Sequence, residues 1–375
     1  MNAPVGVHLV PSGERVDEVA ALASLMGGRV GLEGVLADLN RTAVVATVPG
    51  RAPVWGFRWN AEDNRSQRWF PQGITTSADR GDSSEVDAEE VDADGVDGRL
   101  VVCTSWYSQD IGGLNKGARV TFVDVTSRSA PRYRHVLLVE PFLSAAGVVD
   151  VRPVHVHAGG LVWHGPYLHV AGTRRGLLSF RLDDIVRVPT SGDASALRLH
   201  PDGAVDGFGY KYLLPVRFTY DAFAEDGFEQ LRYSFLSLDR STSPHQLVAG
   251  EYGRDGKTTR LVRYELDPTT SLLITHADGV ARPLQLPVVG VEGMQGATVV
   301  DGTYYVTTSS GRYGYGSLYV GQPGAFTCHA KVLPIGPEDI TYWPSRDELW
   351  SLTEYPSRRY VFVMNRSEFT GPSLG

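Results

Sequence analysis

Cysteine is scarce in this sequence, with only Cys103 and Cys328 among 375 residues. Two thiols cannot build the network of disulfides that stabilises small secreted domains. The opening residues, MNAPVGVHLVPSGERVDEV, lack the basic start and continuous apolar core of a secretory signal. No apolar run reaches the length of about 18 residues that a membrane span needs. We therefore expect a cytoplasmic protein with no membrane partner.

A basic excess and the familiar catalytic signatures are also missing. The chain has 35 Lys and Arg against 43 Asp and Glu, a net charge of −8, which does not favour binding to nucleic acid. G-x-S-x-G, Walker, Rossmann and H-E-x-x-H patterns are absent, so serine-hydrolase, phosphoryl-transfer and hydride-transfer chemistry have no support. We expect no cofactor, with a divalent metal as the lesser alternative.

The sequence is rich instead in short β-type runs separated by turns. Residues 337–365, PEDITYWPSRDELWSLTEYPSRRYVFVMN, contain three runs of β-branched and aromatic residues, with Pro, Ser, Asp and Arg between them. Similar units begin at residues 72, 159, 233 and 295. One such unit cannot bury both of its faces, so the repetition indicates a closed ring of sheets.

The five units predict an all-β fold, a five-bladed β-propeller, with six blades as the alternative. The last unit ends before a fourth strand, which either TAVVATV from Thr42 or VWGFRW from Val54 would supply from the N-terminal side. Residues 210–223 are expected to be the outer strand of the second unit or a flap. Residues 1–40 are predicted to be an extension with one helix over 16–26, and residues 41–375 a single domain.

Two local patterns bear on metal binding. Residues 79–98, DRGDSSEVDAEEVDADGVDG, are predicted to form a solvated acidic loop, and they lack the spacing of an EF-hand calcium loop. His155 and His157 would point to the same face of an extended strand. They could bind a metal with a third ligand, take part in proton transfer, or have a structural role. No metal-ligand set is predicted.

The repeat gathers polar and aromatic residues at one mouth of the central channel. Residues that open each first strand and close each second strand meet there, because neighbouring strands run antiparallel. Core positions are otherwise Val, Leu, Ile and Thr, so these side chains need partners or a ligand. The predicted substrate-binding residues are Gln72, Trp106, Tyr107, Arg174, Tyr233, Glu251, Tyr252, Gln295, Arg312, Tyr313, Glu354 and Tyr355.

Glu338 is the predicted catalytic acid or base, because apolar surroundings would tighten its hold on a proton. His157 or His155 would make the complementary proton transfer. Arg174 and Arg312 could hold a carboxylate or phosphate of the substrate. The alternatives are a polar plug without function and a binding module without catalysis. The expected partner is a small molecule, and the expected state is a monomer or homodimer.

The phrases PQGITTSAD, HAGGLVWHGPYLHVAGT and GPEDITYWPSRDELWSLTEYPSRRYVF resemble an actinobacterial family of β-propeller proteins of mostly unassigned function. The architecture is similar to the six-bladed strictosidine synthase and SMP-30/gluconolactonase propellers. This resemblance implies an enzyme of specialised metabolism in which Glu338 promotes a Pictet–Spengler-like condensation or cyclisation. Hydrolysis of a lactone or glycoside is the alternative, with Glu251, Glu338 and Glu354 as candidate carboxylates for a glycosidase. The lactonase metal site is in doubt, because Glu338 has no evident Asn and Asp partners.

Overall fold

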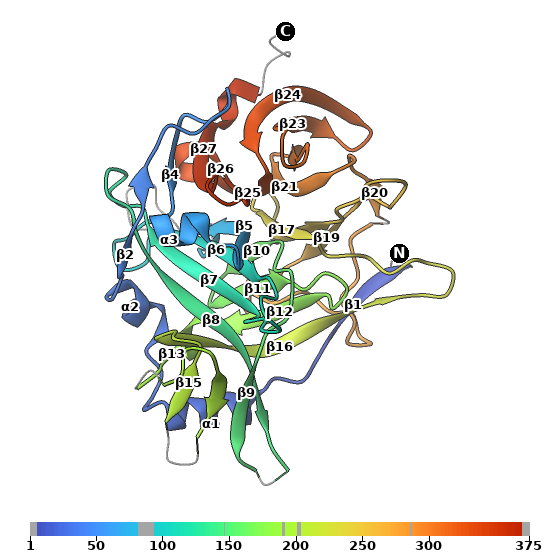
Figure 1. Cartoon of the computed structure of the whole chain (residues 1–375). Coiled ribbons are helices and arrows are strands. Elements are labelled where there is room, and N and C mark those ends of the chain that lie inside the picture. The colour runs from blue at the N-terminus through green and yellow to red at the C-terminus, as the bar shows by residue number, and fades with distance from the viewer. Residues whose placement is uncertain are drawn as a thin grey trace.

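The structure, a computed structural model, describes residues 6–81, 94–145, 147–189, 192–200, 204–285 and 287–369. Strands dominate these residues (Figure 1). The α-helices among them are α1 (Val16–Leu25), α2 (Gly31–Leu36) and α3 (Ala61–Arg65). The β-type runs of the sequence therefore form strands, and the all-β prediction is confirmed.

The first two units form four-stranded antiparallel arrays. The first contains β5 (Trp69–Thr76), β6 (Val101–Ser108), β7 (Ala118–Asp124) and β8 (Arg132–Leu143). The second contains β10 (Leu161–His164), β11 (Tyr167–Ala171), β12 (Leu177–Arg181) and β16 (Tyr212–Ala224). Residues 210–223 were expected to form either the outer strand of the second unit or a flap, and they form the outer strand.

The remaining units follow the same order along the chain. The third array contains β17 (Phe235–Asp239), β18 (Gln246–Gly250), β19 (Arg260–Glu265) and β20 (Val288–Val289). The fourth contains β21 (Met294–Val300), β22 (Thr303–Thr308), β23 (Tyr315–Gln322) and β24 (Ala325–Ile335). The fifth contains β25 (Pro337–Trp343), β26 (Glu348–Thr353), β27 (Tyr360–Asn365) and, from the N-terminal side, β4 (Trp55–Arg58).

Segments from the N-terminal and C-terminal parts of the chain meet in this fifth array. Strand β4, blue in Figure 1, pairs antiparallel with β27, which is red, and β3 (Val44–Val45) adds a further strand beyond β4. The segment from Val54 therefore completes the last unit, and part of the segment from Thr42 extends it.

The outer edges of the first two arrays are also paired. Strand β16 runs parallel to β8 and joins the two arrays into one sheet. Strand β1 (Val7–Pro11) and β13 (Val186–Arg187) pair with β16, while β2 (Arg41–Thr42) and β9 (Val149–Pro153) pair with β8. A separate hairpin contains β14 (Leu197–Leu199) and β15 (Val205–Gly207). Pairing covers edges that would otherwise attract other chains.

The first strands of the five arrays contact one another in circular order, β5, β10, β17, β21, β25 and back to β5, and we call them the inner ring. Glycine permits this close approach. A Cβ on Gly160 would lie 1.9 Å from the backbone nitrogen of Leu236, and one on Gly296 would lie 2.6 Å from the Cα of Asp339. The glycines that follow Gln72 and Gln295 in the sequence therefore have a packing role.

Residues 6–40 contain more structure than one helix. Helix α1 covers the predicted stretch and buries Val19, Leu22 and Ala23. Strand β1 and helix α2 were not predicted. In the described part of the chain, no helix has the length and apolar character needed to cross a membrane.

Most of the predicted acidic loop lies outside the described residues, which resume at Asp94. The carboxylate of Asp94 accepts hydrogen bonds from the indole of Trp343, at 2.8 Å, and from Ser345. The end of the loop is thus attached to the turn between β25 and β26, at the opposite end of β25 from Glu338.

Candidate functional site

A β-bulge interrupts the pairing of three inner-ring strands at matching positions. The register shifts between Pro71 and Ile74 in β5, between Met294 and Gly296 in β21, and between Pro337 and Ile340 in β25. Bulges re-aim side chains and occur often beside active sites. The residues inside these three bulges include Gln72, Gln295 and Glu338, the side chains that the repeat had placed at the channel mouth.

Hydrogen bonds connect these side chains in two pairs. Gln72 donates through Nε2 to Oε2 of Glu354 at 3.3 Å, and Gln295 donates through Nε2 to Oε1 of Glu338 at 3.2 Å. Glu354 follows the end of β26, so residues far apart in the sequence lie together. An amide that donates to a carboxyl oxygen fixes the orientation of the acid, which a proton-transfer group requires.

The two carboxyl groups differ in their surroundings. Glu338 is only 4% exposed, and burial raises its pKa well above the usual value, with Glu354 and Asp339 raising it further. Glu354 is half-buried, and burial raises its pKa too, while hydrogen bonds from Tyr355 and Gln72 oppose the shift. Glu338 therefore keeps its proton more readily, as a general acid must at neutral pH.

Aromatic rings stand beside the acids. The rings of Tyr107 and His157 lie 4.3 Å apart between centroids, and burial, with the charges of Glu354 and Glu338, raises the pKa of Tyr107 to about 12. His157 is exposed to solvent, yet desolvation by surrounding atoms lowers its pKa. Both observations fit a ring in a concave surface. We call Gln72, Tyr107, His157, Gln295, Glu338 and Glu354 the mouth cluster.

Three more predicted residues lie at the edge of this cluster. Burial raises the pKa of Tyr355, and the charges of Glu354 and Glu338 add to the shift, as does Tyr252. Arg312 acts in the opposite sense and lowers the pKa of Glu354. Tyr252 is 37% exposed and Arg312 is exposed. Tyr252 and Arg312 thus form the solvent-exposed edge of the cluster.

Arg359, which the sequence did not single out, lies beneath the cluster. It is fully buried, donates through Nε to the carbonyl oxygen of Glu354 at 2.7 Å, and lies over the ring of Phe70 at 4.8 Å. Burial lowers its pKa to about 10, with the neighbouring Arg119 adding to the shift. It fixes the backbone that carries Glu354.

Two further buried acids continue along the inner ring. The carboxylate of Asp339 accepts the backbone N–H of Ile74 at 3.1 Å, and burial raises its pKa well above the usual value. Asp79 accepts hydrogen bonds from Thr75 at 2.8 Å and Thr341 at 3.1 Å, and burial raises its pKa to about 6. These acids bind neighbouring inner strands together.

Some predicted residues lie elsewhere. Trp106 is fully buried and packs against Trp59 at 4.9 Å, because side chains alternate along β6 and Tyr107 takes the mouth side. Tyr233 is also buried, in the core, where its hydroxyl shares a 2.6 Å hydrogen bond with that of Tyr264. Neither side chain can line the mouth.

Glu251 is a structural acid. Its buried carboxylate accepts two hydrogen bonds from the guanidinium of Arg260, each of 2.9 Å, and one from the backbone N–H of Arg232 at 3.0 Å. Although burial would raise its pKa, these partners lower it. A carboxylate held in this way cannot supply or take the proton of a reaction.

The H-x-H segment does not form a strand, so its residues do not share a face by alternation. His155 is exposed and contacts the carbonyl oxygen of Asn115 at 3.3 Å, whereas His157 joins the mouth cluster. Arg174 and Tyr313 are exposed, and Tyr313 is 86% exposed, so neither is packed into the cluster. Among the described residues, no three His, Cys, Asp or Glu side chains are arranged to hold a metal ion.

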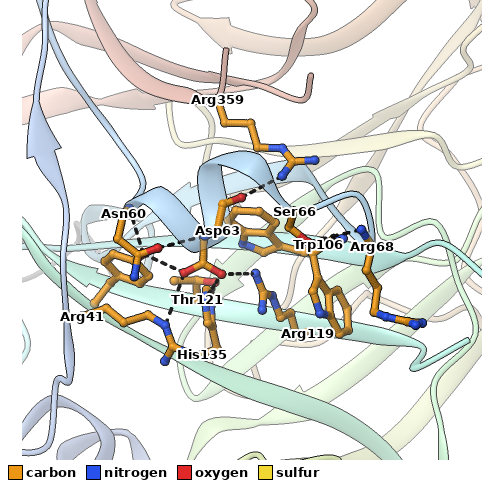
Figure 2. Close-up of polar contacts among 12 residues, drawn as sticks. Arg41, Asn60, Asp63, Ser66, Arg68, Trp106, Arg119, Thr121, His135 and Arg359 are labelled. Atoms are coloured by element: carbon orange, nitrogen blue, oxygen red, sulfur yellow. Dashed lines mark hydrogen bonds and ion pairs between the residues drawn. The ribbon is translucent and has the colours of Figure 1, made fainter. Parts of the chain in front are cut away.

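A second polar network, also missed by the sequence reasoning, surrounds Asp63 (Figure 2). Its carboxylate accepts hydrogen bonds from Arg119 at 3.0 Å and Tyr133 at 2.7 Å, and it lies 3.0 Å from Nε2 of His135. Although burial alone would raise the pKa of Asp63, His135 and Arg119 hold it below its usual value. Arg359 donates to the carbonyl oxygen of Asp63 at 2.7 Å and so joins this network to the mouth cluster.

No family model matches the chain, and no curated protein sequence matches it. Among solved structures, a GH43_1 enzyme from Xanthomonas citri complexed with xylotriose is 10% identical over 93% of this chain and 92% of its own, with a TM-score of 0.35. A gluconolactonase from Xanthomonas campestris is 12% identical over 88% of each chain, with a TM-score of 0.35. The β-propeller domain of Cps50 (Swd1) from Myceliophteria thermophila is 9% identical over 86% of this chain and 99% of its own, with a TM-score of 0.36.

Similarities this weak carry no argument about chemistry, and they do not support the actinobacterial or strictosidine-synthase resemblance. What the chain does has to be argued from its own side chains.

The raised pKa of Glu338 should be visible in how the free energy of unfolding changes with pH. Because the folded protein holds the proton of Glu338 more tightly than the unfolded chain, whose Glu pKa is about 4.5, its stabilising contribution is complete below pH 4.5 and is lost as the pH rises toward the folded pKa. The free energy of unfolding of Glu338→Gln relative to wild type should therefore rise by up to about 1.4 kcal/mol per pH unit in that window.

Urea unfolding at several pH values measures this difference. Glu229→Gln, at a side chain that is 59% exposed and paired with Arg232, is the matched control; it removes an exposed ion pair and should cost less than about 1 kcal/mol. A flat difference for Glu338→Gln would show that Glu338 ionises normally in the folded protein.

Proposed function

We propose that this chain is a five-bladed β-propeller enzyme that converts a small molecule by acid–base chemistry at its channel mouth. The observation that carries the proposal is the pair of carboxyl groups, Glu338 and Glu354, held at one mouth in different surroundings. Titratable groups whose environments separate their proton affinities are typical of acid–base sites.

The blade number is supported by the strand pairing. Each of the five arrays has four antiparallel strands in chain order, apart from the N-terminal strand β4, and their first strands form the inner ring. A six-bladed arrangement would need another inner strand, and the described residues contain no further array of this kind. The narrow ring also explains the glycines at the points where inner strands touch.

The roles of the side chains follow from their contacts. Glu338 donates its proton to an oxygen or nitrogen of the substrate, while Gln295 keeps its carboxyl oriented. Glu354, which is more exposed, takes a proton from water or from the substrate once ionised. The adjacent rings of Tyr107 and His157, tilted by 31° to each other, form a wall against which a flat or apolar part of the substrate can lie.

Two reaction classes remain, each supported by one observation. Hydrolysis of an acetal-like bond requires one protonated and one ionised carboxyl, which Glu338 and Glu354 can supply without Glu251. Condensation or cyclisation of an aromatic amine with an aldehyde requires a general acid beside aromatic walls, which Tyr107, His157 and Tyr355 provide. We favour hydrolysis, because it gives both Glu338 and Glu354 a direct role in the reaction.

Turnover by the purified chain tests the proposal. Wild-type protein should release nitrophenol from at least one member of a panel of nitrophenyl glycosides, or open a panel of sugar lactones. If it instead joins tryptamine or dopamine to aldehydes, the condensation class is correct. Binding of these compounds without turnover would show that the chain is a binding module and would overturn the acid–base proposal.

A further inference from the structure

A cavity of about 320 Å³ lies beside the first array, and none of its lining residues belongs to the mouth cluster. Its walls come from the segment around α3, from β5, β7 and β8, and from the chain that enters β16. The lining residues are Asn40, Arg41, Glu62, Asp63, Ser66, Trp69, Lys116, Arg119, Arg134, His135, Phe208, Gly209, Tyr210 and Lys211. We call it the basic cavity.

The charge of the cavity is opposite to that of the chain. Five basic and two acidic side chains line it, in a protein whose net charge is −8. Asp38, just outside the lining, forms ion pairs with Arg134 and Lys211 and offsets part of this charge. Five cations against three carboxylates still leave a positive excess, and a partly enclosed site strengthens its attraction for an anion.

Two of the cations have N–H groups without an acceptor among the described residues. Lys116 donates through Nζ to the carbonyl oxygen of Ala194 at 2.8 Å and lies 5.1 Å from the ring of Phe208, contacts that use one of its three N–H donors. Arg119 is 3% exposed and binds Tyr210 and Asp63, but its buried Nε–H has no acceptor among the described residues. A buried donor without an acceptor is costly, and an anion in the cavity would satisfy it.

The rest of the network positions the side chain of Arg119. The guanidinium of Arg119 lies 4.5 Å from the rings of both Trp69 and Trp106, so its plane is fixed. Nδ1 of His135 shares a 2.7 Å hydrogen bond with Thr121, and Nε2 lies 3.0 Å from the carboxylate of Asp63 (Figure 2). Burial lowers the pKa of His135 to about 3, so the ring is neutral at pH 7 and adds no charge to the cavity.

We propose that the basic cavity binds a small molecule through an oxyanion, a phosphate or carboxylate group, held by Lys116 and Arg119. Trp69, Phe208 and Tyr210 line the cavity and would contact the uncharged part of the ligand. The volume lies at the lower end of small-molecule sites, which suits a compact ligand with one ring.

Isothermal titration of the full chain with inorganic phosphate, phenyl phosphate and benzoate tests this site. We expect saturable binding of at least one organic anion, tighter for phenyl phosphate than for inorganic phosphate if the aromatic walls contribute. Lys116→Met should weaken it about tenfold, the loss expected for one charge-assisted hydrogen bond. Lys257→Met, at an exposed lysine that does not line the cavity, should bind as wild type does.

The result is independent of the reaction proposed for the channel mouth. Glu338→Gln should bind phenyl phosphate as tightly as wild type, since Glu338 does not line the basic cavity. Binding that Lys116→Met leaves unchanged would overturn the proposal. So would the absence of binding for all three probes at millimolar concentration.

Discussion

Glu338→Gln is expected to lower kcat/KM by at least about 100-fold on any substrate that the wild-type chain turns over, the scale typical of general acid–base assistance. The amide has nearly the shape of the acid and can still contact Gln295, which lies 3.2 Å away, but it has no proton to give. Because substrate contacts are preserved, the loss should fall mainly on kcat. Steady-state kinetics across the pH range measures both parameters.

Two comparisons make this result specific. Glu354→Gln should also lower kcat and should remove the acidic limb of the pH–rate profile if Glu354 works in its ionised form. Glu229→Gln, at an exposed side chain, should leave both parameters unchanged. If Glu338→Gln retains wild-type kcat, Glu338 is not the proton donor and the catalytic assignment is wrong.

Asp63→Asn should reduce the free energy of unfolding by about 3–5 kcal/mol, the cost of breaking a buried ion pair by removing one partner. The side chain of Arg119 is only 4% exposed and its salt bridge is to Asp63, so the change leaves a buried cation without its counter-charge. The amide keeps only one oxygen, so it cannot accept both from Arg119, which bonds to Oδ1, and from Tyr133, which bonds to Oδ2. Equilibrium unfolding in urea, followed by tryptophan fluorescence, measures the loss.

An exposed ion pair provides the control for this prediction. Asp278 and Arg282 lie 2.6 Å apart at the surface, and Asp278→Asn should cost less than about 1 kcal/mol. If Asp63→Asn costs no more than this control, the network around Asp63 contributes little to stability and Arg119 tolerates the loss of its partner.

The positions of the strands could be predicted from the sequence because each inner strand begins a recognisable repeat. The units expected at residues 72, 295 and 338 start inside β5, β21 and β25, and the unit expected at residue 159 starts two residues before β10. Pairings between distant segments were harder to predict. Strand β8 pairs parallel with β16, and β1 also pairs with β16. These pairings join segments that are far apart in the sequence, and no repeat in the sequence indicates them.

The candidate site was predicted in part. Gln72, Gln295 and Glu338 share a repeat position, and the hydrogen bonds place each beside a partner at the mouth. The prediction paired Trp106 with Tyr107, although strand alternation sends neighbours to opposite faces. It grouped Glu251 with the other acids because a sequence does not reveal that Arg260 neutralises it.

The pairing of β4 with β27 has a consequence for how the protein is made. The partner of a strand near residue 55 lies near residue 360, so β4 has an open hydrogen-bonding edge until β27 has been synthesised. Contacts of such wide sequence separation form slowly, and exposed edges invite association between nascent chains. Biosynthesis of this molecule therefore passes through an incomplete ring with an open strand edge.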